Sequence, residues 1–305
     1  MLEQTVPIIS NERDTDAYFR LVLRAPQIAP LIQPGQFAHV RILPLKDALL
    51  RRPFSIFQVE GETFSILYKT VGKGTEVLSR MRAGAELSVI APLGHGFTVP
   101  TAGSETPLLV AGGYGMAAMF LLAQRSPQAG IVFVGGRRRV DILCEKEFAA
   151  LGWEVRVTTE DGSHGETGWV TLPLLAELRR LAAPLSSGSS RGDEAQSETS
   201  ETSNPKCDIS PNRLTSAATI LKLVPHQKVK LFACGPTPML KAVGKIAEDF
   251  HLPAELSMDE HMCCGVGTCL TCVIPVKTKD GWEYQRTCTE GPVFDSRQIL
   301  WETVK

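Results

Sequence analysis

The chain has 305 residues, of which 43% are hydrophobic and 21% are charged, and its formal net charge is -1. This composition indicates a globular protein long enough for two or three domains. The nearly neutral charge gives no electrostatic reason to expect nucleic acid or an anionic membrane as a partner. The first residues lack the basic and apolar regions of a secretory signal, so we expect a cytoplasmic protein whose eight cysteines do not form disulfides.

Residues 1–100 contain short runs of alternating apolar residues with turn residues between them. These runs are AYFRLVLRAP, GQFAHVRIL, FSIFQV, TFSILYKTV and AELSVIAPLG. Alternation at this spacing predicts antiparallel strands that form a small barrel or a sandwich. We therefore expect an all-β domain over residues 1–100.

From residue 104 onward, apolar runs typical of buried strands alternate with helical patterns. The expected strands are LLVAGG, GIVFVGG, WEVRVTTEDG and KVKLFACGP, and the expected helices are MAAMFLLAQR, CEKEFAALG and TPMLKAVGKIAEDF. This alternation predicts an α/β domain over residues 104–252, built on a parallel sheet with crossover helices, and leaves residues 253–305 as a small third domain. Glycines interrupt the uncharged run 106–124, which favours a strand, turn and helix over a membrane span.

Residues 184–216 break the α/β pattern. The segment is rich in Ser, Glu, Asp and Asn and contains few residues that a core could bury. We predict a disordered insertion on the surface, in which Cys207 has no expected role.

Four cysteines near the end of the chain have the spacing of a metal site. Cys264, Cys269 and Cys272 follow a C-x4-C-x2-C pattern, and Cys288 lies further along. The pattern matches the plant-type spacing of a two-iron, two-sulfur cluster. Structural zinc also binds four thiolates, but its cysteines usually come in two short pairs, and Cys288 stands alone. We therefore expect an iron–sulfur cluster rather than zinc.

The residues around these cysteines refine the prediction. Gly265 and Gly267 allow the loop to approach inorganic sulfide without a Cβ clash. Cys263 is an alternative to Cys264 as the first ligand, with a spacing one residue longer. We choose Cys264 and expect Cys263 to be buried and not to bind the cluster.

Residues 51–56, RRPFSI, place two arginines at the start of an apolar strand. Arginine forms paired hydrogen bonds with phosphate, and the aromatic and hydroxyl residues that follow could contact a planar ring. A solvated pair of arginines would explain the motif equally well on its own. The glycine-rich residues 71–75, VGKGT, favour the phosphate interpretation because their backbone can approach a pyrophosphate.

Several motifs occur in the order seen in ferredoxin–NADP reductase-like proteins. They are PGQF, RRPFSI, LYK with GT, APLGHGF, AGGYGMAA and CGPTPML. With the cysteine loop and CTEGPVF, the chain closely resembles the electron-transfer subunits of class 1B dihydroorotate dehydrogenase, except over residues 184–216. The resemblance implies an N-terminal flavin barrel, a central pyridine-nucleotide domain and a C-terminal cluster domain.

The resemblance also implies which residues contact FAD. Arg52 is expected at the pyrophosphate, and Ser55 near the reactive edge of the isoalloxazine. The matching residues are Arg52, Pro53, Phe54 and Ser55 in one segment, and Leu67, Tyr68, Lys69, Gly74 and Thr75 in a second.

Two turns that follow strands are candidates for binding NAD. The first contains Gly112, Gly113 and Gly115, and the second contains Cys234, Gly235 and Pro236. A turn that opens a helix presents backbone N–H groups to a diphosphate, although packing alone can also require glycine there.

Other residues of this domain bear on the choice of nucleotide. Arg137 or Arg138 would suit the additional phosphate of NADP, but the resemblance implies NAD, which we retain. We assign His164 no catalytic role.

The resemblance implies electron flow from the FMN of a catalytic partner, through the 2Fe-2S cluster and FAD, to NAD. The dihydroorotate site is expected on that partner, in a heterotetramer of two copies of each subunit, so we assign no catalytic residue to this chain. A related reductase subunit that serves ferredoxin, a hydrogenase or a glutamate synthase-like partner is an alternative. An alternative of another class is a binding module that is stabilised by structural zinc and has no redox function.

Overall fold

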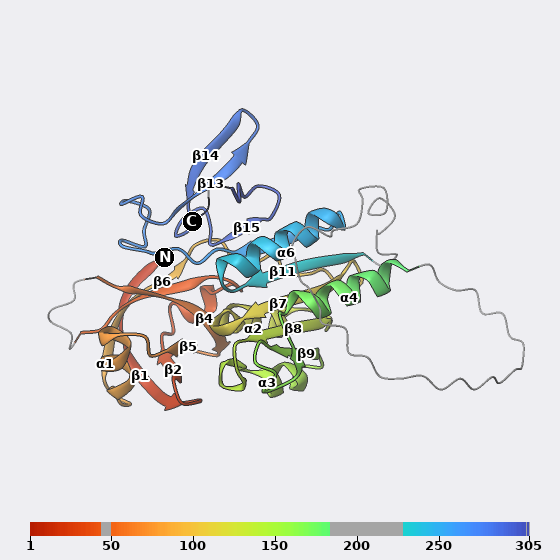
Figure 1. The fold of residues 1–305 in the computed structure, drawn as a ribbon. Coiled ribbons are helices and arrows are strands. Elements are labelled where there is room, and N and C mark those ends of the chain that lie inside the picture. The colour runs from red at the N-terminus through yellow and green to blue at the C-terminus, as the bar shows by residue number, and fades with distance from the viewer. Residues whose placement is uncertain (44–49, 184–227, 303, 305) are drawn as a thin grey trace, which may run out of the picture.

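The computed structural model describes residues 1–43, 50–183, 228–302 and 304. The predicted insertion at 184–216 lies outside the described residues. An N-terminal barrel stands beside a sheet that is covered by helices, and the C-terminal segment lies across both (Figure 1). Within the described residues, every helix is too short or too polar to cross a membrane.

Six antiparallel strands close the barrel in the order β1-β2-β5-β4-β3-β6. They are β1 (Leu2–Arg13), β2 (Tyr18–Arg24), β3 (Phe37–Arg41), β4 (Arg52–Glu60), β5 (Thr63–Lys69) and β6 (Glu86–Leu93), with a short 3-10 turn η1 (Ala29–Leu31) between β2 and β3. Their inward apolar side chains fill one core. The predicted all-β domain is confirmed as a closed barrel. β1 was not predicted, because Val6 and Ile8 are its only buried apolar side chains.

Helix α1 (Lys73–Arg80), between β5 and β6, was also not predicted. At its N-terminus, the Thr75 hydroxyl accepts the backbone N–H of Val71 at 2.9 Å. At its C-terminus, Asn11 of β1 donates to the carbonyls of Leu78 and Met81 at 2.7 and 3.1 Å. These bonds satisfy backbone groups that a short helix leaves free and fix α1 against the barrel.

The second domain is a seven-stranded sheet of order β10-β9-β8-β7-β11-β12-β15. Its strands are β7 (Thr106–Gly112), β8 (Ile131–Gly136), β9 (Glu154–Thr159), β10 (Glu166–Thr167), β11 (Val229–Cys234), β12 (Ala254–Ser257) and β15 (Val293–Asp295). All neighbours are parallel except β12 and β15. The parallel sheet is confirmed, but it does not end at residue 252, because β12 and β15 extend it.

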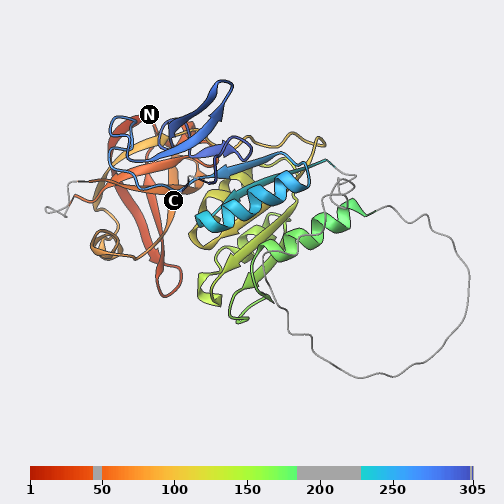
Figure 2. The ribbon, with the colours of Figure 1, turned by 45° about the horizontal axis from the view of Figure 1, so that its top comes forward.

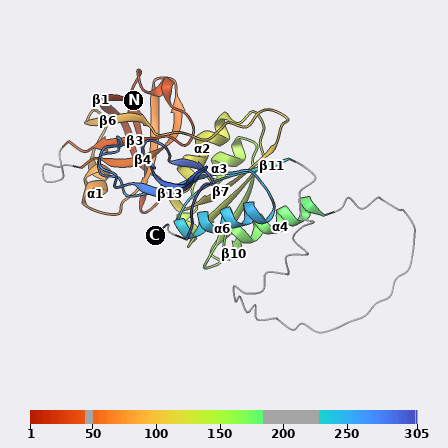
Figure 3. The ribbon, with the colours of Figure 1, turned by 90° about the horizontal axis from the view of Figure 1, so that it is seen from above.

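Helices cover both faces of the sheet. They are α2 (Met116–Arg125), α3 (Glu145–Ala150), α4 (Thr171–Ala182) and α6 (Thr237–Asp249), with 3-10 turns η2 (Gly113–Gly115) and η3 (Arg139–Asp141). Helices α4 and α6 lie on one face, and α2 and α3 lie on the other (Figure 3). Helix α2 also packs against the barrel, where Phe120 stacks on Phe57 of β4 at a centroid distance of 4.5 Å. The two domains therefore share a continuous apolar core.

The C-terminal segment adds a hairpin of β13 (Val273–Thr278) and β14 (Gly281–Arg286). The hairpin stands above the junction of barrel and sheet (Figures 1 and 2). The cysteine loop lies between β12 and β13, and Cys272 and Cys288 pack with Phe37 and Leu93 of the barrel. The loop is thereby held against the barrel rather than against the helices.

Candidate functional site

The cysteine loop bends sharply at two glycines. Gly265 and Gly267 have φ angles of +69° and +85°, a backbone conformation that other residues rarely adopt. The bend turns the N–H groups of Val266 and Thr268 toward the Cys264 sulfur, which accepts them at 3.5 and 3.3 Å. Backbone donors of this kind stabilise a thiolate and the metal bound to it.

The four predicted ligands form an outer and an inner pair. The exposed Cys269 interacts with Cys264, and the Thr271 hydroxyl lies 3.1 Å from the Cys269 sulfur. The hydrogen bond from Thr271 is the main cause that lowers the pKa of Cys269 to about 6. Cys288 interacts with Cys272, and both are almost fully buried. Burial raises the pKa of Cys288 to about 12.

Two pairs of thiols suit a group that contains two metal centres. A two-iron, two-sulfur cluster takes four cysteines, two on each iron, whereas structural zinc draws four ligands to one ion. The paired arrangement of the cysteines therefore fits the predicted cluster.

Cys263 is partly exposed, so our expectation that it is buried was wrong. Desolvation and the neighbouring Cys269 raise the pKa of its thiol. Cys264, by contrast, carries the sulfur that the backbone of the loop surrounds. Cys264 stays our predicted ligand.

The barrel touches the cysteine loop through two histidines. A Cβ atom at Gly265 would lie 2.4 Å from Nδ1 of His39, so the ring of His39 presses on the loop backbone. Burial, with a smaller contribution from the nearby Arg51 guanidinium, lowers the pKa of His39 to about 4. Nδ1 of His95 lies 2.7 Å from the Thr289 carbonyl oxygen.

The predicted pyrophosphate residues lie together at the start of α1. A Cβ atom at Gly74 would lie 2.6 Å from Nε of Arg52, so the glycine makes room for the arginine side chain. Arg52 also donates to the Leu50 carbonyl. A guanidinium above the first turn of a helix combines positive charge with free backbone donors. This cradle fits a pyrophosphate.

The other predicted flavin residues divide into two groups. Pro53, Phe54 and Ser55 lie half-buried at the start of β4. Leu67 and Tyr68 are buried in the core, and the Tyr68 hydroxyl donates a hydrogen bond to the side-chain Oδ1 of Asn11 at 3.1 Å. Burial raises the pKa of Tyr68 to about 12. The Leu67 and Tyr68 side chains therefore belong to the interior of the protein, and both residues pair with β2 in the barrel.

Lys69 makes an ion pair between the domains. Its ammonium lies 3.0 Å from the Asp141 carboxylate in η3 and 4.9 Å from the centre of the Tyr18 ring. Asp141 and Tyr18 are buried, and Lys69 is partly covered. The Lys69 side chain thus joins the barrel to the nucleotide domain.

The predicted nucleotide turns pack against each other. A Cβ atom at Gly115 would lie 2.2 Å from the Cys234 carbonyl oxygen, and one at Gly235 would lie 3.0 Å from the Gly112 backbone nitrogen. Packing therefore explains these glycines, while Gly113 has a positive φ of +54° and open space around it.

The second turn leads into α6. Pro236 occupies the position just before the helix, as is typical of a helix start. Burial raises the pKa of the Cys234 thiol to about 12, so this cysteine is a small neutral side chain beneath the turn.

Polar residues of the nucleotide domain differ in their contacts. Arg137 and Arg138 are exposed. Hydrogen bonds from Ser163, with a smaller contribution from the nearby Arg138 guanidinium, lower the pKa of the Asp161 carboxyl. His164, to which we assigned no catalytic role, has its Nε2 atom 2.7 Å from the Glu145 carboxylate.

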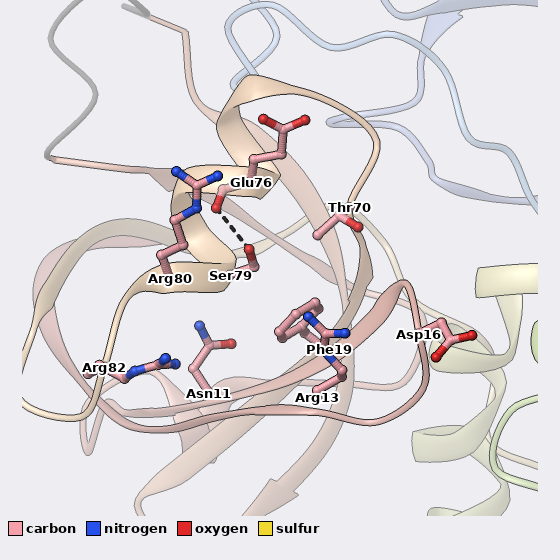
Figure 4. A pocket seen from close by; sticks show the side chains of 9 residues that line it. All are labelled: Asn11, Arg13, Asp16, Phe19, Thr70, Glu76, Ser79, Arg80 and Arg82. Carbon is pink, nitrogen blue, oxygen red and sulfur yellow. Dashed lines mark hydrogen bonds between the residues drawn. The ribbon is translucent and has the colours of Figure 1, made fainter.

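A cavity of about 500 Å³ lies between the β1–β2 hairpin and α1 (Figure 4). Its lining residues are Asn11, Arg13, Asp16, Phe19, Thr70, Glu76, Ser79, Arg80 and Arg82. Thr70 and Glu76 adjoin the second predicted flavin segment, but none of the predicted cofactor residues lines the cavity. We assign it no role.

Comparison with known proteins identifies the family. Residues 259–300 match the model of the iron–sulfur cluster binding domain of dihydroorotate dehydrogenase B. The chain is 34% identical over 283 residues to the "Dihydroorotate dehydrogenase B (NAD(+)), electron transfer subunit" of Desulforamulus reducens, covering 91% of this chain and 90% of that protein. It is 31% identical over 304 residues to the subunit of the same name from Geobacillus kaustophilus, covering 97% and 98%. The chain belongs to this family.

Solved structures support the fold of this electron transfer subunit. An NADH-dependent reduced ferredoxin-NADP oxidoreductase superposes with a TM-score of 0.71 at 22% identity, covering 97% of this chain and 90% of that one. A ferredoxin NADP+ reductase from Neisseria gonorrhoeae superposes with a TM-score of 0.56 at 14% identity, covering 81% and 91%. The predicted family, fold class and oxidoreductase role are confirmed. The individual site residues stay predictions.

Proposed function

We propose that this electron transfer subunit carries electrons from the FMN of a dihydroorotate-oxidising catalytic subunit to NAD, through a 2Fe-2S cluster and FAD, in pyrimidine biosynthesis. Family membership supports the reaction and the need for a catalytic partner. The proposal includes a cytoplasmic heterotetramer with two copies of each subunit.

The position of β4 is the observation that carries the proposed route. The predicted flavin motif, Arg52–Ser55, opens β4, and α2 of the nucleotide domain packs against the same strand. On its other side β4 pairs with β3, whose Phe37 packs with Cys272 and Cys288. The motif therefore lies between the nucleotide domain and the cysteine loop, in the order that the route requires.

The chain's own residues hold the groups in this order. When bound, the flavin supplies the exchange between two-electron hydride transfer and single-electron transfer. Arg52 and the first turn of α1 would bind its pyrophosphate, and the half-buried Ser55 would lie beside its ring. Four thiolates would hold the cluster, and Phe37 and Leu93 pack with the two inner cysteines in one buried apolar contact.

The outer pair of cysteines faces the surface, where the partner would dock. Cys269 is exposed, and the side chain of Leu270 beside it is 62% exposed with a φ of +57°. Trp282 and Tyr284 on the nearby hairpin are 57% and 62% exposed and pack edge to face. Exposed apolar groups beside an electron-transfer site suit a protein partner that covers the site.

Reconstitution with an FMN-containing catalytic subunit tests the proposal. The purified complex should reduce NAD when dihydroorotate is added, and NADH should reduce the flavin of the isolated chain. Arg52→Gln should lower the flavin content and remove both activities, whereas Arg137→Gln, which changes an exposed arginine, should leave both unchanged. A complex with full flavin and iron that oxidises NADH but does not reduce NAD with dihydroorotate would contradict the proposal and favour a reductase that serves another partner.

A further inference from the structure

His39 is a fully buried histidine whose ring makes no well-formed hydrogen bond within the described part of the chain. It lies on β3 with 0% of its surface exposed, and among the described residues neither Nδ1 nor Nε2 makes a hydrogen bond of good geometry, although the ring lies close to the backbone of Cys264 and Arg51. Buried polar atoms in native proteins are nearly always paired, so an unpaired imidazole inside the fold needs an explanation.

The neighbours of His39 show what it faces. A Cβ atom at Gly265 would lie 2.4 Å from Nδ1 and 2.8 Å from Cε1 of His39, so the ring is in contact with the loop of the predicted cluster. The preceding residue of that loop, Cys264, is a predicted ligand. In the sheet, His39 pairs directly with Pro53 of the flavin motif. His39 therefore lies between the two predicted redox sites.

A structural role alone does not explain this residue. An apolar side chain of similar size would fill the same space without burying two unpaired nitrogens. His95, at the same junction of barrel and cysteine loop, illustrates the usual solution, because its Nδ1 atom is paired with the Thr289 carbonyl oxygen. The imidazole of His39 has at least one N–H in either protonation state, and within the described residues no acceptor stands in good hydrogen-bond geometry with it.

We propose that His39 is a positioning residue that donates a hydrogen bond to a sulfur atom of the cluster or of its Cys264 ligand. The inference rests on the proposed function, because it requires the cluster to be present. An N–H directed at sulfur stabilises the additional negative charge of the reduced state, and the potentials of iron–sulfur clusters respond to such bonds. His39 thereby raises the reduction potential of the cluster and favours electron transfer to it.

Redox titration of the cluster and the flavin tests the proposal. His39→Leu removes the donor while keeping an apolar side chain, and should shift the cluster potential to a more negative value without moving the flavin potential. His39→Gln keeps an N–H donor and should restore part of the shift. His95→Gln disturbs the same junction and should leave the cluster potential unchanged. An unaltered potential in His39→Leu protein with full iron and sulfide content would overturn the proposal.

A second measurement starts from the wild-type chain. Pulsed electron paramagnetic resonance of the reduced wild-type chain, labelled with 15N-histidine, should show a histidine nitrogen coupled to the cluster. The coupling should disappear in labelled His39→Gln and persist in labelled His95→Gln. A wild-type cluster without any histidine coupling would overturn the proposal. A wild-type chain that binds no cluster would overturn the proposed function and this inference with it.

Discussion

The cysteine loop and the nucleotide turns both depend on glycine, but they use it in different ways. At the nucleotide turns, Gly115 and Gly235 make room for the chain's own backbone. In the cysteine loop, Gly265 makes room for an imidazole without a well-formed hydrogen bond among the described residues. The first arrangement is complete as it stands, whereas the second leaves a buried donor and an exposed thiol with a lowered pKa.

This difference shows how much each region says about a ligand. Glycines that packing already requires add no separate evidence for nucleotide binding, so that assignment depends on the family. Polar groups that the protein leaves unpaired are independent evidence for a bound group, because burying them costs free energy until a partner is present. The structure therefore supports the cluster site more directly than the nucleotide site.

The largest effect is expected from removing one ligand of the outer pair. Cys269→Ser should lose most of the cluster, because a hydroxyl replaces a thiolate that the structure stabilises with the Thr271 hydroxyl. Electron transfer to the catalytic subunit should be abolished, while NADH should still reduce the flavin. Iron and sulfide analysis with the visible absorption spectrum measures the loss.

Cys263→Ser provides the matched control for this change. Cys263 adjoins the loop but lacks the backbone donors that surround Cys264. The control should keep its iron, and the Cys264→Ser protein should lose it. The opposite result would transfer the ligand assignment from Cys264 to Cys263.

A smaller effect is expected at the nucleotide turns, where glycine serves packing. Gly115→Ala would place its Cβ atom 2.2 Å from the Cys234 carbonyl oxygen, which is backbone and cannot rotate away. We expect a loss of about 2–3 kcal/mol in the free energy of unfolding, as for other overpacked sites. Urea denaturation of the wild-type and substituted chains measures this loss.

Gly113→Ala separates packing from backbone strain. No atom lies within 4 Å of the added methyl group, but the φ angle of +54° disfavours alanine. The expected loss is about 1 kcal/mol. Equal losses for the two substitutions would contradict the view that turn-to-turn packing requires Gly115.

Much of the fold followed from local patterns in the sequence. Strongly apolar strands such as β7 and helices such as α2 were predicted because burial on all sides leaves few polar residues in them. The strand β1 and the helix α1 were missed because β1 buries few apolar residues and α1 depends on distant Asn11 for its C-terminal bonds. Contacts with residues that are distant along the chain leave no pattern in the local sequence, so they cannot be predicted from it.

Only part of the candidate site could be predicted from the sequence, because some of its contacts join residues that are distant along the chain. Cysteine spacing is a local property, so the four ligands could be proposed from sequence. His39 is 225 residues away from Cys264 along the chain, and no motif links them. The pairing of Lys69 with Asp141 is equally non-local, and it gives the lysine a structural contact where the family resemblance suggested only a flavin contact.

A further modest effect concerns a buried carboxylate of the nucleotide domain that pairs with arginines of the same domain. Glu177 of α4 is 2% exposed and interacts with Arg180 and with Arg156, at 2.5 and 2.9 Å. The hydrogen bond from Arg180 is the main cause that lowers the pKa of Glu177 in the folded chain. Because the folded pKa is below the unfolded value, this pair stabilises the fold above about pH 4.5 and loses its contribution as the pH falls further.

Glu177→Gln tests this expectation without changing the size of the side chain. At neutral pH the substitution should cost about 1–2 kcal/mol, less than for a fully buried pair because both arginines retain contact with water. The difference between the wild-type and Glu177→Gln free energies of unfolding should shrink as the pH falls below the unfolded pKa. Effects of acid on the cluster are common to both proteins and cancel in that difference. A difference that stays constant with pH would show that Glu177 acts through packing rather than through its charge.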